Sequence, residues 1–76
     1  MNYPDGQKVE VGDEVELWRG CRGTIVALID EAKFAPDYEK SEWGYLERGV
    51  LVDSDAVGLL HQLKPDQNWK LVRRAA

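Results

Sequence analysis

The chain has 76 residues, of which 43% are hydrophobic and 32% are charged, and its formal net charge is −4. This length limits the chain to a single domain, residues 1–76, and the composition is that of an ordinary globular protein rather than a disordered segment. The acidic balance argues against general affinity for nucleic acid, because neutralising phosphates requires clustered lysines and arginines.

Apolar runs and cysteine content suggest where the protein resides. The longest apolar run, residues 25–29, is far shorter than the roughly 18 residues that a membrane-spanning helix needs. The first six residues contain neither a basic start nor an apolar stretch, so we expect no secretory signal. Cys21 is the only cysteine, which excludes an internal disulfide. We therefore expect a cytoplasmic protein that makes no membrane contact.

The N-terminal third alternates between turn signals and strand patterns. Pro4, Asp5 and Gly6 predict a turn, and the valines of residues 8–11 alternate with charged side chains as in a half-buried strand. Gly12 and Asp13 predict a second turn. The same alternation over residues 14–18 then predicts a second strand.

Four further strands are expected along the chain. The segment of residues 20–23 predicts a hairpin turn, and residues 24–29 form a β-branched run that is apolar on both faces, as in a central strand. The remaining strands are expected at residues 50–52, 58–63 and 69–72. Short strands separated by turn glycines indicate an all-β fold, and this length favours a small barrel.

Residues 30–48 interrupt the strand pattern, and we call this segment the excursion. It is too long for a hairpin turn. Pro36 and the acids that follow it predict one or two helical turns within residues 36–43. Residues 30–47 hold six acids against two lysines, so the local charge of −4 equals that of the whole chain. Tyr38, Trp43 and Leu46 are expected to anchor the excursion to the sheet.

Two stretches resemble the opening of KOW, Tudor and CAP-Gly domains: residues 11–17 (VGDEVEL), and Gly20 followed by residues 23–26 (GTIV). The resemblance implies a small SH3-like barrel of five or six short antiparallel strands with one inserted acidic loop or short helix. Trp43-Gly44 and residues 49–53 are also similar to the middle of a CAP-Gly domain. The asparagine-containing glycine motif that recognises tubulin tails has no counterpart after Asp53, which removes the reason to expect microtubule binding.

A second resemblance covers more of the chain. Residues 3–6, 43–46, 49–52 and 58–61 look like segments of small uncharacterised bacterial proteins from toxin and immunity gene neighbourhoods. This resemblance implies a cytoplasmic immunity protein that blocks one toxin with an acidic face.

Few residues are available for catalysis or metal binding. A nucleophilic pair of Cys21 and His61 is formally possible, with Arg19 and Arg22 lowering the thiol pKa, but a small loop residue and a strand residue are the simpler interpretations. Structural zinc requires about four Cys or His ligands, and the acids at 53 and 55 lack the further oxygen ligands of a calcium loop. We predict a protein that is not an enzyme and that needs neither cofactor nor metal.

The excursion is the predicted binding surface. Exposed tryptophan and tyrosine are enriched at protein interfaces, and acids would select a partner with a basic surface. The predicted partner-binding residues are Asp37, Tyr38, Glu39, Glu42, Trp43 and Tyr45. The alternative is a KOW-like contact with RNA or another nucleic acid through the basic residues Arg19, Arg22, Lys70, Arg73 and Arg74. The sequence leaves the identity of the partner and the oligomeric state open.

Overall fold

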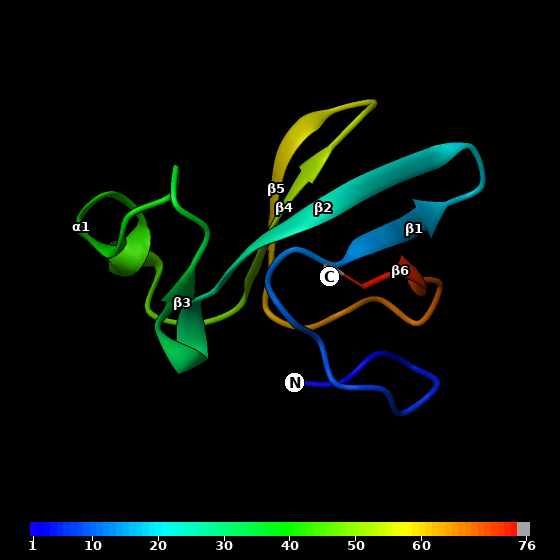
Figure 1. Ribbon diagram of the computed structural model, residues 1–76, viewed down its shortest axis with the longest axis horizontal. Coiled ribbons are helices and arrows are strands. Elements are labelled where there is room, and N and C mark those ends of the chain that lie inside the picture. The colour runs from blue at the N-terminus through cyan, green and yellow to red at the C-terminus, as the bar shows by residue number, and fades with distance from the viewer. Residues whose placement is uncertain (75–76) are drawn as a thin grey trace.

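A computed structural model describes residues 1–74 and shows one six-stranded antiparallel sheet (Figure 1). Its strands are β1 (Glu14–Trp18), β2 (Cys21–Leu28), β3 (Lys33–Phe34), β4 (Val50–Ser54), β5 (Gly58–Gln62) and β6 (Lys70–Arg73). Two 3-10 turns, Ile29–Glu31 and Gly44–Leu46, and one short helix, α1 (Lys40–Trp43), lie within or beside the excursion. The predicted all-β class is confirmed, and so is the helical turn.

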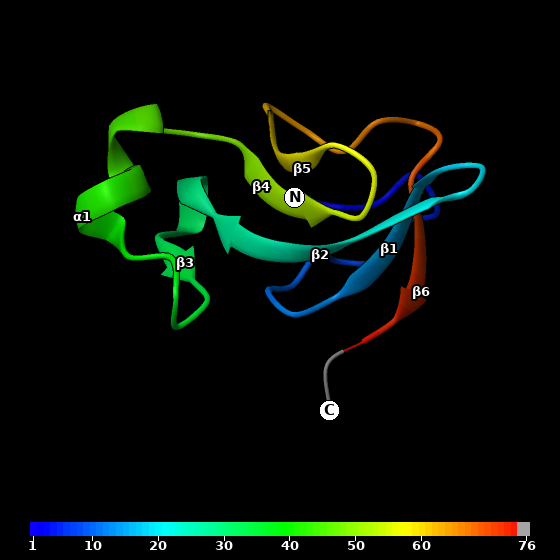
Figure 2. The same ribbon diagram turned by 90° about the horizontal axis from the view of Figure 1, so that it is seen from above.

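The sheet is built around β2, the longest strand. The strand order is β5-β4-β2-β1-β6, with β3 paired to β2. One edge of β2 pairs first with β1 and then with β3, while its other edge pairs with β4. Figure 2 shows β2 running from the end that holds β1 and β6 towards the end that holds α1. No ladder joins β5 to β6 in the described part of the chain, so the sheet is open.

The main core lies on one face of this sheet. In β1, Val15 and Leu17 are buried while Glu14 and Glu16 are half-buried, which is the period-two pattern that the sequence predicted. The core cluster consists of Tyr3, Val9, Val15, Leu17, Cys21, Ile25, Leu28, Val50, Val52 and Trp69. Each fully buried valine or leucine contributes roughly 1.5–3 kcal/mol, so this cluster is the main stabilising feature.

A second, smaller core explains why β2 is apolar on both faces. The pairing of β2 with β4 skips Val26, which is the extra residue of a β-bulge and turns the strand locally. Val26, Ala27, Ile29 and Leu51 form this second cluster, and the side chains that pack against it are Phe34, Ala35, Tyr38, Trp43 and Leu46. The excursion is therefore the layer that covers the outer face of β2, and the predicted anchoring of its aromatic side chains is confirmed.

The predicted strand at residues 8–11 is wrong. Residues 1–9 instead fold back on themselves, with an isolated bridge between Asn2 and Lys8 and with the N–H of Val9 donating to the carbonyl of Met1 at 3.0 Å. The chain then turns at Gly12, whose φ is +96°. Val9 is buried as the alternation predicted, but it reaches the core from a loop rather than from a strand.

The predicted turn at residues 20–23 is shorter than expected. Only Arg19 and Gly20 form the turn, and β2 begins at Cys21. Gly23 lies inside β2, where a Cβ atom would come within 2.7 Å of Val52 Cγ1 and 3.0 Å of the Asp53 carbonyl oxygen. Gly23 is therefore a packing residue that lets β4 approach β2 closely.

Candidate protein-binding surface

The two ends of the excursion are held together at its base. The backbone N–H of Ile29 donates to the carbonyl of Gly49 at 2.9 Å, and the carboxylate of Asp30 accepts the N–H of Gly49. One position earlier, the carbonyl oxygen of Arg48 lies 2.8 Å from Nε2 of His61. Both polar backbone groups of Gly49 are thus bonded to the residues where the excursion begins.

Gly49 occupies a place that only glycine fits. Its φ is +107°, and a Cβ atom there would lie 2.4 Å from the carbonyl oxygen of Gln62 and 2.7 Å from Nε2 of His61. Both the positive φ and the close approach of β5 require a residue without a side chain. The end of the excursion is therefore fixed in position against β5.

The inner side of the excursion is apolar. The rings of Tyr38 and Trp43 lie 6.3 Å apart between centroids at an interplanar angle of 43°, and both pack against the second core cluster. The N–H of Ala35 donates to the carbonyl of Val26 at 2.8 Å, continuing the pairing of β3 with β2. Backbone bonds and aromatic packing together hold a segment whose helical turn is too short to be stable alone.

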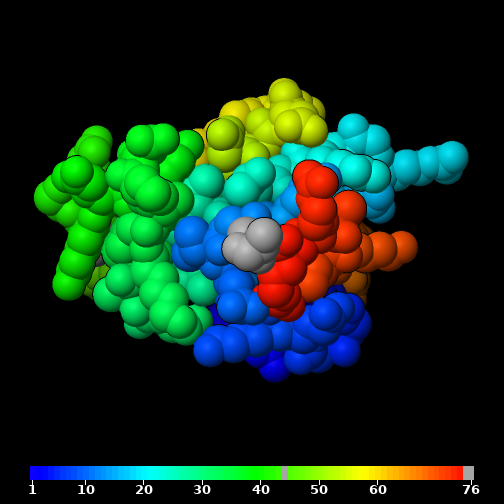
Figure 3. Space-filling view, viewed as in Figure 1, coloured from blue at the N-terminus to red at the C-terminus, as the bar shows by residue number. Residues whose placement is uncertain are grey.

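The outer side of the excursion carries charge. Of its six acids, Asp30 bonds Gly49, and Glu31 forms ion pairs with Lys33 at 3.4 Å and with Lys8 at 4.0 Å. The other four are exposed, and no salt bridge within residues 1–74 reaches any of them: Asp37, Glu39, Glu42 and Glu47. Figure 3 shows the segment projecting from one end of the molecule.

The six residues predicted to bind a partner fall into two groups. Asp37, Glu39 and Glu42 are exposed, and Tyr45 is the most exposed large hydrophobic residue described, at 73%. Tyr38 and Trp43 are half-buried and turn towards the second core. The first group is available to a partner, whereas the second group positions the segment that displays it.

The basic residues of the alternative site largely have acidic partners. Arg22 and Arg73 both bond the carboxylate of Glu14, at 3.2 and 2.7 Å, because β2 and β6 flank β1. Arg19 and Lys70 are exposed, and no salt bridge in the described residues involves them. The face formed by β1, β2 and β6 is therefore one of mixed charge rather than a basic patch.

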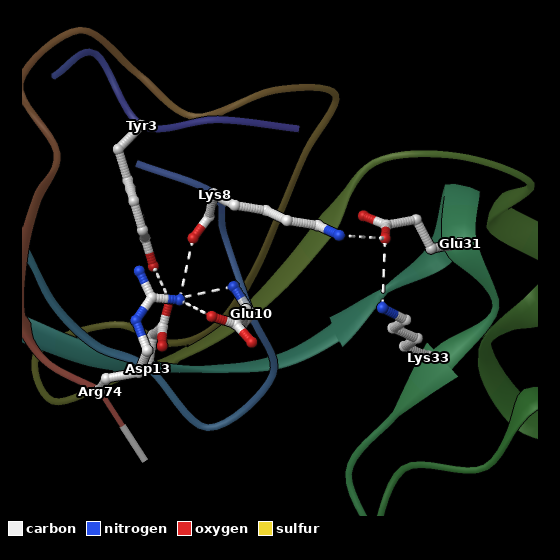
Figure 4. Close-up of polar contacts among 7 residues, drawn as sticks. All are labelled: Tyr3, Lys8, Glu10, Asp13, Glu31, Lys33 and Arg74. Atoms are coloured by element: carbon white, nitrogen blue, oxygen red, sulfur yellow. Dashed lines mark hydrogen bonds and ion pairs between the residues drawn. The ribbon is translucent and has the colours of Figure 1, made fainter. Parts of the chain in front are cut away.

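Sequence reasoning missed the role of Asp13. This carboxylate is fully buried, and its Oδ2 accepts the hydroxyl of Tyr3 at 2.6 Å and the N–H of Glu10 at 3.0 Å (Figure 4). Arg74 lies 3.6 Å from the same oxygen and also pairs with Glu10. Three causes raise the pKa of the Tyr3 hydroxyl. The largest is burial, the second is the hydrogen bond to Asp13, and the third is the negative charge of Asp13. The Gly12-Asp13 pair gave only a turn signal, which carries no information about burial.

Asp13 connects the two ends of the chain. Tyr3 comes from the N-terminal loop and Arg74 follows β6, yet both contact one carboxylate. The second oxygen of Asp13, Oδ1, is buried without a hydrogen-bond partner in the described residues. The contacts made by Oδ2 account for the burial of this charge, and we assign Asp13 a structural role.

The formal pair of Cys21 and His61 is not brought together. Cys21 is the buried first residue of β2, whereas His61 is an exposed residue of β5. His61 pairs with Leu51 of β4, and Leu51 pairs with Ala27 of β2. Six positions along β2 separate Cys21 from Ala27, which is about 20 Å of strand. Among residues 1–74, no three His, Cys, Asp or Glu side chains are grouped as a metal site would require.

Comparisons with known proteins add no relative to this description. No protein-family model, no curated protein and no solved structure matches the chain. None of the helices in the described part of the chain has the length and apolar character needed to span a membrane.

Proposed function

We propose that the chain is a non-enzymatic, cytoplasmic protein-binding module whose excursion binds a basic surface on a partner protein. The observation that carries the proposal is the combination of four exposed acids without ion pairs and an exposed Tyr45 on one anchored segment. Glu39 accepts a hydrogen bond from the hydroxyl of Ser41, but none of the four acids has a cationic partner within the described residues, so their charge stays available to another molecule.

We propose further that the sheet is an SH3-like barrel. Two features support this fold: the C-terminal strand β6 returns to pair with β1, and the long β2 is shared between two groups of strands. In this arrangement the barrel stays open between its two edge strands, β5 and β6. The excursion then occupies an insertion between β2 and β4, where it changes the binding surface without changing the strand order.

The exposed side chains of the excursion and its rigidity both support binding. Exposed acids raise the association rate with a basic partner, and Tyr45 provides a large ring to bury at the centre of the contact. The bonds of Gly49 and the packing of Trp43 fix the excursion before binding. A segment that is already ordered loses less conformational entropy on association.

An immunity protein is the specific form of this function that we favour. A toxin that acts on nucleic acid carries a basic substrate site, and an acidic segment of this kind is suited to cover it. The product of the adjacent gene is therefore the first partner to test by pull-down.

The proposal is tested by mapping where a basic ligand binds. Addition of an arginine-rich peptide to the isotopically labelled protein is expected to shift the amide resonances of residues 37–47 in a nuclear magnetic resonance titration. The control is the same titration with the double variant Glu39→Lys, Glu42→Lys, which is expected to abolish those shifts. Shifts confined to other residues would contradict the proposed surface.

Nucleic-acid contact is the second candidate, favoured only by the exposed Arg19 and Lys70. Because Glu14 pairs with both Arg22 and Arg73, this face offers little uncompensated positive charge. A titration with generic RNA at low salt distinguishes the two functions. Salt-sensitive RNA binding that is lost in Arg19→Ala, Lys70→Ala would favour the second candidate.

A further inference from the structure

The strand β5 has one unpaired edge. It forms a ladder with β4 along its whole length, from Gly58 opposite Ser54 to Gln62 opposite Val50. On its other side, no ladder or other backbone hydrogen bond in residues 1–74 reaches β5. Figure 1 shows the β4–β5 hairpin standing clear of β1 and β6. The outer backbone groups of β5 are therefore free to pair with another strand.

This edge lacks the usual protection against pairing. Native edge strands are commonly blocked by charged side chains, above all lysine, or by proline. Residues 56–63 (AVGLLHQL) contain no Asp, Glu, Lys, Arg or Pro, although 32% of the chain is charged. Leu59 is 37% exposed, and the residues that flank the strand, Val57 and Leu63, are 56% and 57% exposed. The edge is thus both uncharged and apolar.

We propose that β5 pairs antiparallel with β5 of a second copy of this chain, about a two-fold axis at Leu60. In this register Gly58 lies opposite Gln62 and Leu59 lies opposite His61, in both directions, as a two-fold interface requires. Val57 of one copy then meets Leu63 of the other at each end. Every position that meets a partner is uncharged, so the surface is complementary to itself.

The absence of charge selects a second copy over other occupants. A basic or acidic partner would find no opposite charge along residues 56–63. Such a partner could make only uncharged contacts there, and a second copy of the chain makes the same contacts equally well. The exposed acids of the excursion, and Asp53 and Asp55 next to β5, lie outside this strand. Pairing therefore extends the sheet across two copies without placing like charges opposite one another on the paired strands.

The expected dimer is weak. Two five-residue strands with their flanking residues bury less than the about 1,200 Å² that marks the smallest stable complexes. Dimerisation is therefore expected only at high protein concentration. It is independent of the proposed function, because the excursion contributes no residue to the pairing.

The test is sedimentation analysis of the whole chain over roughly 10 μM to roughly 1 mM. The weight-average mass of the unaltered protein is expected to rise from the monomer value of 8.6 kDa towards twice that value. Leu59→Lys should keep the monomer mass, because it places a lysine on the edge. Val72→Lys, at an exposed position of β6, makes the same change in net charge and is expected to leave dimerisation intact.

Hydrogen exchange on the unaltered protein provides a second measurement that needs no variant. The amides of β5 are expected to exchange at least about threefold more slowly at the highest concentration, while those of α1 remain unchanged. A mass that stays at 8.6 kDa throughout would overturn the proposal. So would a dimer that Leu59→Lys forms as readily, or concentration-dependent protection confined to segments other than β5.

Discussion

The carboxylate of Asp30 accepts a hydrogen bond from the N–H of Gly49, which lies 19 positions further along the chain. This contact closes a long excursion into a compact segment and fixes where its exposed acids stand. The backbone bond between Ile29 and Gly49 acts at the same place. The display of charge at one end of the molecule thus depends on how this base is built.

Loss of the Asp30 carboxylate is expected to loosen the excursion. In Asp30→Ala the N–H of Gly49 loses its partner, and we expect a decrease of about 1–2 kcal/mol in the free energy of unfolding. Asp37→Ala removes an exposed acid of the same excursion and is expected to change it by less than about 0.5 kcal/mol. Urea denaturation of both variants compares them, and equal stability of the two would show that the contact at Gly49 contributes nothing.

Gly49 is expected to be far less tolerant than Gly58. Both have positive φ, but only at Gly49 does a Cβ atom meet neighbouring atoms, whereas Gly58 has none within 4 Å. We expect Gly49→Ala to destabilise the fold by roughly 3 kcal/mol or more, and Gly58→Ala by about 1 kcal/mol. Thermal unfolding measures the difference. Similar melting temperatures for the two variants would contradict the close approach of β5 to Gly49.

Substitution of Trp43 is expected to lower stability, whereas substitution of Tyr45 is expected to weaken binding. Trp43 packs against the second core, so Trp43→Ala is expected to lower the free energy of unfolding by about 1–3 kcal/mol. Tyr45 is exposed, so Tyr45→Ala is expected to leave stability within about 0.5 kcal/mol while weakening the binding of a basic partner. Denaturation and binding titrations on both variants check this. A destabilised Tyr45→Ala with normal binding would reverse the assigned roles.

The buried pair of Tyr3 and Asp13 predicts a loss of stability at alkaline pH. The folded state raises the pKa of the Tyr3 hydroxyl, whereas an unfolded tyrosine ionises near about pH 10. Above that pH the unfolded chain releases a proton that the folded chain retains. Stability is therefore complete below about pH 10 and falls by up to about 1.4 kcal/mol per pH unit above it.

Tyr3→Phe isolates this contribution. The variant is expected to be less stable at neutral pH by about 1.5–3 kcal/mol, because a hydrogen bond to a buried carboxylate is lost. Its deficit relative to the unaltered protein should shrink as the pH rises beyond about 10. Tyr45→Phe, which changes an exposed ring, serves as the control. A deficit that stays constant with pH in Tyr3→Phe would exclude Tyr3 as the titrating group.

Periodicity in the sequence was sufficient to predict most of the strands. The alternation in residues 14–18 and the continuous apolar run of β2 identified strands that the structure contains, because side-chain direction in a strand follows directly from residue order. The apolar character of both faces also predicted that this run is a central strand, and its second face is covered in the structure. The excursion covers that face.

Contacts between distant segments could not be predicted from the sequence. Val9 alternates with charged residues as a strand residue would, but the N-terminal loop reaches the core by pairing with itself. Burial of Asp13 depends on Tyr3 and Arg74, which come from opposite ends of the chain. The same holds for the basic residues Arg22 and Arg73, whose common partner Glu14 is set by strand order. Composition showed an acidic excursion, but only the fold distinguishes its four exposed acids without a salt bridge from Asp30 and Glu31, which are bonded at its base.

The association rate between the protein and an arginine-rich peptide, measured by stopped-flow fluorescence at low and high salt, tests the acidic excursion most directly. We expect Glu39→Lys, Glu42→Lys to slow association about tenfold or more and to flatten its salt dependence. The double variant Asp53→Lys, Asp55→Lys, which makes the same change in net charge away from the excursion, should associate nearly as fast as the unaltered protein. Equal rates and equal salt dependence for the two double variants would contradict binding through the excursion.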